Sequence, residues 1–289
     1  MTATVDSRPS DFVTFWNEIL VPKFIRYKHV LVDGLGHHSD AIFPKLEVNP
    51  GERVLDVGCG FGDTACMLAE RVGPSGEVVG MDCCDAFLAY GREEAADRGL
   101  ANLRFVEADI EAHPFEGDFD MAFSRFGTMF FLNPVAAMRN IRRALRPGGR
   151  LTAIVWRDRA DNHWGSVPKE TILRHLPEPG ADAQTCGPGP FSQADREMVT
   201  GQLEAAGYGD IGFERVDAPF RTGLSVEDAI AFQLAVGPAG EIYREAEELA
   251  RQKHDEIVAD LAAAYAPYVR EDGVFMPSSS WVISARNPA

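Results

Sequence analysis

The stretch Val54-Leu-Asp-Val-Gly-Cys-Gly-Phe-Gly62 decides the fold of this chain of 289 residues. An apolar run, residues 53–57, predicts a strand, three glycines follow at positions 58, 60 and 62, and a helical pattern begins at Thr64. Glycine lets the backbone turn sharply and lets a ligand approach without a Cβ in the way. The third glycine comes two residues after the second, whereas the dinucleotide fingerprint G-x-G-x-x-G has it three residues after. The spacing therefore argues against NAD.

Asp56 adds a charge to this turn, because it lies inside the strand just before the glycines. A carboxylate there would repel a pyrophosphate. S-adenosylmethionine (SAM) instead has a zwitterionic amino-acid tail and a sulfonium cation, and the carboxylate suits its ammonium group, directly or through water. The alternative is that Asp56 only caps the turn.

Three further features follow the ends of later strands. Asp82 comes 20 residues after Gly62, where an acid can accept hydrogen bonds from both ribose hydroxyls. Asp109 can accept a hydrogen bond from an adenine amino group, although a plain turn aspartate is the alternative. The segment 123–131 follows the fourth strand. Ligands of open α/β sheets bind at the carboxyl ends of the strands, so together these features predict one nucleoside site.

The chain alternates between strand and helix patterns from Glu52 onward. The predicted strands are 53–57, 77–81, 103–106, 119–123 and 150–156, and the predicted helices are 64–72, 86–98 and 134–145. This alternation predicts an α/β fold with a doubly wound, Rossmann-like parallel sheet and helices on both faces.

Outside this alternation the periodicity predicts mostly helices. Those expected are 12–32, in which Pro22 starts a second helix, then 193–206, 226–235 and 241–266. The segments 34–39 and 177–191 are expected as loops, and 211–216 and 280–285 as strands.

These motifs resemble the class I SAM-dependent methyltransferases. The residues that carry the resemblance are Leu55–Gly62, the acid at 82, Ala108-Asp109 and Leu145-Arg-Pro-Gly-Gly-Arg150. The phrase Ser124-Arg-Phe-Gly-Thr-Met-Phe-Phe131 is similar to the subgroup related to ubiquinone/menaquinone-biosynthesis (UbiE-like) methyltransferases. The close match covers about residues 50–157.

The resemblance implies a seven-stranded sheet whose last strand, Trp281 to Ala285, inserts antiparallel at the sheet edge. It implies Gly58 and Gly60 against the methionyl tail, and Ser124-Arg125 beside the sulfonium. The cofactor-binding residues expected from motif and resemblance together are Asp56, Gly58, Cys59, Gly60, Asp82, Cys83, Asp109, Ile110, Ser124 and Arg125.

We divide the chain into four parts on this basis. Residues 1–45 form an N-terminal helical lid, 46–217 the SAM-binding core, 218–275 a helical insertion that caps the site, and 276–289 the final core strand. We expect the lid and the insertion to be mobile.

Methyl transfer is an in-line displacement, so the protein mainly has to position the acceptor and exclude water. No metal is expected, and His37-His38 has no further ligand at metal spacing. The expected acceptor-binding residues are Tyr27, Phe126, Met129, Trp156 and Trp164. The two tryptophans would form an aromatic wall, whereas core packing is the alternative for Met129. Candidate bases are His37, His38 and His163, with a structural role as the alternative for each.

Composition restricts the partners. The chain has 28 basic and 44 acidic residues, a formal charge of −16, which disfavours DNA or RNA and favours a small-molecule acceptor. The arginines at 139, 142, 143, 146 and 150 are interpreted as a solvated helix face. The five cysteines, of which Cys83 and Cys84 are adjacent, show no disulfide framework, and no signal peptide or apolar run of ~20 residues is present. A cytoplasmic protein is expected.

Two other functions stay open. One is an NAD(P)-dependent oxidoreductase, which the glycine spacing and Asp56 disfavour. The other is a SAM-binding regulatory protein without catalysis, because methyl transfer requires no particular catalytic residue.

Overall fold

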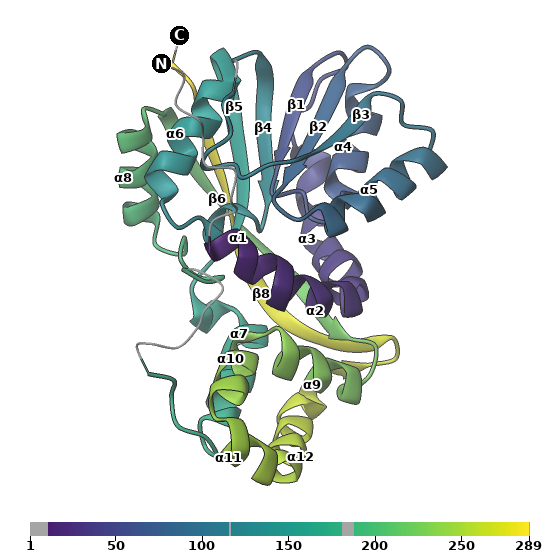
Figure 1. The fold of residues 1–289 in the computed structure, drawn as a ribbon, viewed down its shortest axis with the longest axis vertical. Helices are drawn as coiled ribbons and strands as arrows, with labels where there is room; N and C mark the ends of the chain where they lie inside the picture. Colours follow the sequence, from purple (N-terminus) through teal and green to yellow (C-terminus); the bar gives the residue numbers. More distant parts are fainter. Residues whose placement is uncertain (1–10, 116, 181–187, 289) are drawn as a thin grey trace.

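The computed structural model describes residues 11–115, 117–180 and 188–288. Residues 1–10 of the expected lid, and residues 181–187 of the expected loop with Cys186, lie outside the described residues. In Figure 1 the sheet and its flanking helices form the upper part of the molecule and a group of helices the lower part. Helices α1 and α2 cross the region between them.

The described strands form one mixed sheet in the order β3-β2-β1-β4-β5-β8-β6, with the two-residue β7 pairing to β8. Their bounds are Arg53–Val57 (β1), Glu77–Asp82 (β2), Leu103–Glu107 (β3), Phe119–Arg125 (β4), Leu145–Trp156 (β5), Gly209–Gly223 (β6), Val269–Arg270 (β7) and Gly273–Arg286 (β8). Strands β1 to β5 pair in parallel, and β8 runs antiparallel to both β5 and β6. The doubly wound, mostly parallel sheet with an antiparallel last strand is confirmed. Strand β8 lies one place in from the edge, which β6 occupies.

Alternation along the strands separates the core into two layers. Val54 and Ile154 pack on one face of the sheet, and their neighbours Leu55 and Val155 pack on the other. Helix α4 covers the first face, whereas α6 and α8 cover the second. The bounds of the core helices are Asp63–Val72 (α4), Asp85–Asp97 (α5), Pro134–Ala144 (α6) and Arg196–Ala206 (α8), with a 3₁₀ turn at Thr128–Phe130 (η4).

Strands β6 and β8 extend well beyond the core, which the sequence pattern did not show. Their ladder is continuous from Gly209 opposite Arg286 to Gly223 opposite Val274, with two register shifts. The domain boundaries expected at 217/218 and 275/276 therefore fall inside paired strands. In Figure 1 both strands run from the sheet down to the lower helices. These helices, which we call the cap, are His163–Ile172 (α7), Val226–Ala235 (α9), Pro238–Glu245 (α10), Glu247–Gln252 (α11) and His254–Tyr265 (α12).

The single helix expected at 241–266 is wrong, because the chain turns twice within it. Glu247 has a left-handed φ of 44°, and Lys253, at φ −96° and ψ 3°, separates α11 from α12. Both α10 and α12 pack against α7 and α9, which one straight helix of this length does not allow. The contacts of α10 and α12 with α7 and α9 have overridden the helix propensity of residues 247–253, which include neither glycine nor proline.

The loop expected at 34–39 is also wrong, because these residues belong to helices. Gly34 ends a π-helical turn and Leu35 begins α3. A Cβ on Gly34 would lie 2.3 Å from the carbonyl oxygen of Arg221 in β6. Glycine is needed there for close helix–strand packing and not for a turn.

The N-terminal segment is a chain of short helices that touch both parts of the molecule. They are Asp11–Phe15 (α1), Trp16–Leu20 (η1), Val21–Arg26 (α2), Val30–Gly34 (η2), Leu35–Ile42 (α3) and Phe43–Lys45 (η3). Pro22 lies in the first turn of α2, as expected. The hydrogen bond between His29 Nε2 and the Asp228 carboxylate, at 2.8 Å, connects this segment to helix α9 of the cap.

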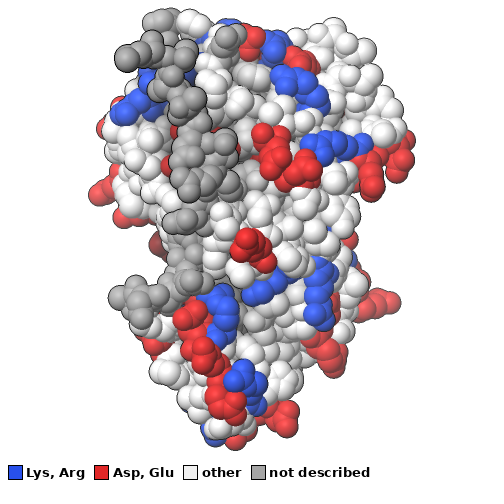
Figure 2. Space-filling view, in the orientation of Figure 1, with Lys and Arg blue, Asp and Glu red and all other residues white. Residues whose placement is uncertain are grey.

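The arginines interpreted as a solvated helix face have mostly structural partners. The Arg142 guanidinium donates to the carbonyl oxygen of Ala206, and that of Arg150 pairs with Glu52. On the face that Figure 2 shows, acidic and basic side chains are interspersed. None of the described helices is long and apolar enough to cross a bilayer.

Candidate active site

The glycine turn after β1 is the first element of the site. Gly58, Gly60 and Gly62 have φ values of 64°, 52° and 82°, which favour glycine over every other residue. A Cβ on Gly62 would lie 2.7 Å from the ring of Phe105. By contrast, the space around Gly60 is open, because a Cβ there meets no atom within 4 Å. The turn therefore packs closely on its protein side and leaves room at Gly60.

A cavity of about 180 Å³, which we call the cofactor cavity, opens beside this turn. Eight of the ten expected cofactor-binding residues line it, namely Gly58, Cys59, Gly60, Asp82, Cys83, Asp109, Ile110 and Arg125. The other two, Asp56 and Ser124, are fully buried and do not line it. The Ser124 hydroxyl donates to the carbonyl oxygen of Val57 and so ties β4 to β1.

Asp82 is held in place by backbone N–H groups. Its Oδ2 accepts from Gly60 at 2.9 Å and its Oδ1 from Cys84 at 3.0 Å. Each carboxylate oxygen keeps a second lone pair for a ligand hydroxyl. Burial raises the pKa of Asp82 to about 6, although these N–H donors lower it. The carboxylate is therefore positioned and oriented before a ligand arrives.

Asp56 is connected to the cofactor cavity only through the Thr64 side chain. Its Oδ2 accepts a hydrogen bond of 2.7 Å from the hydroxyl of Thr64, which lines the cofactor cavity, and its Oδ1 has no partner among the described residues. Burial raises the pKa of Asp56 to about 7. The Thr64 oxygen, which donates its proton to Asp56, can accept from an ammonium group in the cavity.

The Asp82-Cys83-Cys84 corner is the one group of described residues with metal-ligand spacing, with its ligand atoms within 4.8 Å of one another. A thiol binds metal as the thiolate. The hydrogen bond with Cys83, together with burial and the charge of Asp82, holds the pKa of the Cys84 thiol far above its ordinary value. These surroundings therefore favour the protonated form of the Cys84 thiol.

Arg125 places a positive charge at the end of β4. Its guanidinium pairs with Asp63 at 2.7 Å and donates to the Ser39 hydroxyl at 2.8 Å. The next residue, Phe126, has a left-handed φ of 56°, which is strained for a side chain of this size. The turn stacks the Phe126 ring on Trp156, with the ring centroids 4.0 Å apart.

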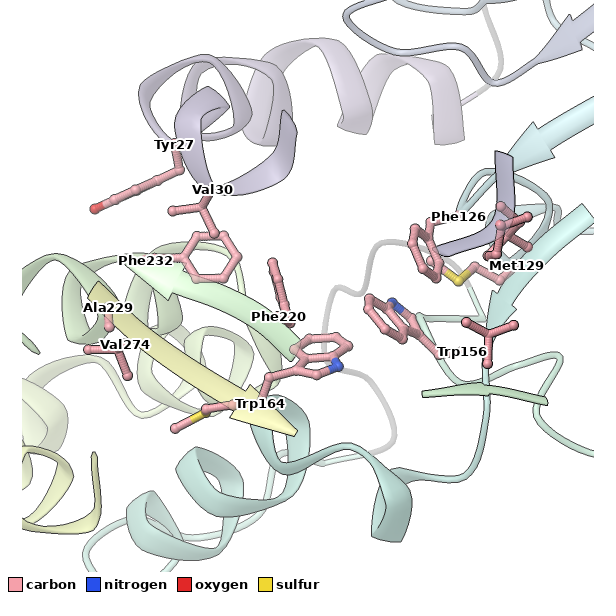
Figure 3. Close-up of a cluster of buried hydrophobic side chains, with 14 of the residues drawn as sticks. Tyr27, Val30, Phe126, Met129, Trp156, Trp164, Phe220, Ala229, Phe232 and Val274 are labelled. Atoms are coloured by element: carbon pink, nitrogen blue, oxygen red, sulfur yellow. The ribbon is translucent and has the colours of Figure 1, made fainter. Parts of the chain in front are cut away.

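A second cavity of about 570 Å³, which we call the acceptor cavity, lies next to the first. The two cavities share six lining residues, namely Trp16, Phe24, Leu31, Leu35, Phe126 and Phe130. Figure 3 shows Phe126, Met129 and Trp156 on the core side, with Trp164 and Phe220 facing them. Of the expected acceptor residues, Phe126, Met129, Trp156 and Trp164 line this cavity. Tyr27 does not, because its ring packs on Phe232.

The N-terminal helices supply wall residues that the sequence analysis missed. Phe24, Leu31 and Leu35 recur at intervals of seven and four, a spacing that one uninterrupted helix would place on a single face, and in the structure they come from α2, η2 and α3. That spacing is visible in the sequence. What it faces is decided by tertiary packing, so only the structure shows that it closes both cavities.

None of the three candidate bases lines either cavity. His38 is fully buried, with its Nδ1 at 3.0 Å from the hydroxyl of Ser280 and its Nε2 at 2.8 Å from that of Ser278. Burial lowers the pKa of His38 to about 3. The His163 ring bonds the hydroxyl of Tyr268, and the His37 ring packs on Phe275. All three have structural partners.

Comparison with known proteins identifies the family. Residues 48–178 match the model of a methyltransferase domain family. The ubiquinone/menaquinone biosynthesis C-methyltransferase UbiE of Idiomarina loihiensis is 32% identical over 178 residues, which cover 58% of this chain and 71% of that protein. The chain belongs to the class I SAM-dependent methyltransferases. The UbiE of Ectopseudomonas mendocina is 43% identical over 109 residues, and there the match spans only 43% of the relative's length.

Solved structures show the same fold for this methyltransferase. Phosphoethanolamine N-methyltransferase 2 of Haemonchus contortus, in complex with SAM, has a TM-score of 0.59 at 18% identity, covering 97% of this chain and 61% of that one. YcgJ of Bacillus subtilis has a TM-score of 0.57 at 18% identity, covering 88% and 99%. At 18% identity, each of these similarities shows a shared fold and nothing about activity.

The residues of the cofactor cavity fit SAM. The open space at Gly60, the free lone pairs of Asp82 and the apolar side chain of Ile110 suit a backbone-bound tail, a ribose and an adenine. This assignment also explains the buried carboxylate of Asp56, which the Thr64 hydroxyl connects to the cavity.

Proposed function

We propose that this methyltransferase transfers the methyl group of SAM to a small, flat, largely apolar acceptor bound in the acceptor cavity. The supporting observation is the wall that the two cavities share, because it places an aromatic chamber directly beside the nucleoside site. A volume of about 570 Å³ lies within the range of small-molecule sites, roughly 300–1,000 Å³.

The cofactor residues have separate roles in this proposal. Asp82 accepts from the ribose hydroxyls, and Asp109 and Ile110 hold the adenine. Gly58 and Gly60 lie against the methionyl tail, whose ammonium group donates a hydrogen bond to the Thr64 hydroxyl oxygen.

Catalysis then rests on position. SAM would supply an activated methyl group. The acceptor atom would bond to the methyl carbon as the carbon–sulfur bond breaks, leaving S-adenosylhomocysteine, and a proton carried by the acceptor atom would pass to water on product release. The stacked rings of Phe126 and Trp156 hold the acceptor face in line. The residues of the N-terminal helices exclude water. The burial of His38 and its two serine partners favour a structural role for it over that of a base.

The N-terminal helices and the cap together serve as the cover of the site. Phe24, Leu31 and Leu35 close the cavities from one side, and Phe232 of the cap, together with Phe220 of β6, closes the acceptor cavity from the other. Acceptor exchange then requires the N-terminal helices to move, since the cap is carried on paired strands.

Two measurements test the proposal. Calorimetric titration with SAM, S-adenosylhomocysteine and NAD is expected to show binding of the first two only, and Asp82→Asn is expected to weaken both by about tenfold or more. Asp85→Asn, an exposed acid on α5 that lies outside the cavity wall, is the matched control.

Formation of S-adenosylhomocysteine with a panel of quinols, phenols and aromatic amines is then measured, with the product's methyl position assigned by NMR. Binding of SAM without turnover of any panel member would favour a regulatory SAM-binding protein. Binding of NAD would favour the oxidoreductase.

A further inference from the structure

Among the residues that the structure describes, the wall of the acceptor cavity carries charge only where the cofactor cavity does not share it. Five ionisable residues line that part, namely Arg159, Lys169, Glu178, Glu241 and Arg244. Three of the five are cationic, although the chain has a formal charge of −16. The chamber therefore combines an apolar aromatic part beside the cofactor with a polar part that is locally positive.

Arg159 is distinguished from the other cations by its surroundings. Lys169 is paired with Glu178 at 2.8 Å, and Arg244 with Glu245 at 3.2 Å. Arg159 has no carboxylate within 4.0 Å among the described residues, and its guanidinium lies over the Phe191 ring, 4.9 Å from the centroid.

The Arg159 side chain is half-buried, and this burial lowers its pKa although the charges of Glu178 and Glu241 raise it. A partly desolvated cation without an ion-pair partner is costly, and an anion that comes close to it lowers that cost.

The backbone under Arg159 is fixed by the fold. Arg159 follows the end of β5 by three residues and opens a 3₁₀ turn, Arg159–Asp161 (η5). The buried amide of Asn162 donates to the carbonyl oxygens of Asp158, at 3.0 Å, and of Ser279, at 3.1 Å. The Arg157–Asp161 ion pair, at 2.9 Å, closes the same turn. The backbone from which the Arg159 side chain extends is therefore fixed relative to Trp156, which ends β5.

We propose that the acceptor is an amphipathic anion, with a flat apolar body on Phe126 and Trp156 and a carboxylate or similar anionic group bound by Arg159. The guanidinium offers planar paired donors that match a carboxylate. This inference rests on the proposed function, because it assigns the chemical class of acceptor to the same cavity. Binding by Arg159 would also distinguish anionic from neutral aromatic compounds, which the stacked rings alone would not do.

The test compares two probes of the same shape, 2-naphthoate and 2-naphthamide, titrated calorimetrically into protein saturated with S-adenosylhomocysteine. The wild-type protein is expected to bind the carboxylate about tenfold or more tightly than the carboxamide. In Arg159→Gln the two probes are expected to bind within about twofold of each other, and Arg159→Lys is expected to keep part of the preference. Arg174→Gln is the matched control, because Arg174 is an exposed cation beyond the end of α7 that does not line the cavity.

Each outcome is decisive. Equal binding of the two probes to wild type, or an undiminished preference in Arg159→Gln, overturns the assignment of Arg159 and leaves the proposed methyl transfer standing. Binding of neither probe overturns this inference, whereas the turnover panel tests the proposed methyl transfer separately. If Arg159→Gln does not fold, the assignment of Arg159 is judged from two results: the preference of the wild-type protein for the carboxylate, and the reduction of that preference in Arg159→Lys.

Discussion

The buried histidine of α3 is expected to make this protein sensitive to mild acid. His38 is fully buried between the hydroxyls of Ser278 and Ser280, and its pKa is lowered from 6.5 to about 3 by burial, by Arg125 and by His37, against a small opposing effect of Asp217. Between those two pH values the unfolded chain binds a proton that the folded chain rejects. The contribution of His38 is therefore complete above pH 6.5 and is lost as the pH falls below it.

The size of this loss of stability follows from the shift in the His38 pKa. At pH 5 the unfolded histidine is 1.5 units below its pKa, and each unit corresponds to about 1.4 kcal/mol. Lowering the pH from about 8 to about 5 should therefore cost the wild-type protein about 2 kcal/mol through His38 alone. His38→Gln keeps hydrogen-bonding capacity for the serines and removes the titration.

Urea unfolding of wild type and of His38→Gln at both pH values gives four free energies of unfolding. Taking the difference between the two proteins at each pH cancels the other titrating groups. This difference should shift by about 2 kcal/mol in favour of the variant at the lower pH. A difference that stays constant with pH would refute the reasoning.

Three further predictions follow from the site. The pKa of Asp56 is raised from 3.8 to about 7, so the stability that its protonated form contributes is lost as the pH rises towards 8; Asp56→Asn should therefore gain about 3 kcal/mol on wild type between pH 5 and 8 in the same urea assay, and a constant difference would contradict this. Gly62→Ala combines a φ of 82° with a clash against an aromatic ring of β3, so it should lower the free energy of unfolding by about 2 kcal/mol or more, whereas Gly73→Ala, with a φ of 66° and open space, should lose less. Limited proteolysis should show slower cleavage of the N-terminal helices when SAM is bound, and an unchanged cleavage pattern would count against their role as a cover.

The core of the fold could be predicted because local pattern and tertiary structure agree there. The β1 strand, its glycine turn and the acid at the end of β2 are set by spacing along one short segment. The same holds for the cofactor cavity, where backbone geometry and a few adjacent side chains make most of the wall. Asp56 was expected at the ligand and lies behind Thr64, because a residue in the middle of a central strand is covered on both faces.

The acceptor side could not be predicted in this way, because its wall comes from elements far apart in the sequence. The segment that begins at Gly34 has the composition of a loop, but it is helical, and Gly34 allows the helix to pack closely against β6. Glu247 interrupts a strong helical pattern for the sake of packing on α7 and α9. Arg159 has no local motif, and its role becomes visible only once the cavity around it is known.

The position of β8 has a consequence for how the molecule is completed during synthesis. Strands β1 to β5 can associate as they leave the ribosome, and the glycine turn can be finished with them. Strand β6, whose only neighbour among the described strands is β8, cannot complete its hydrogen-bonded pairing until β8 has emerged. The cofactor cavity, whose described lining ends at Phe131, can thus form early, whereas the acceptor cavity, whose wall includes Phe220 of β6, takes shape only after β8 has emerged.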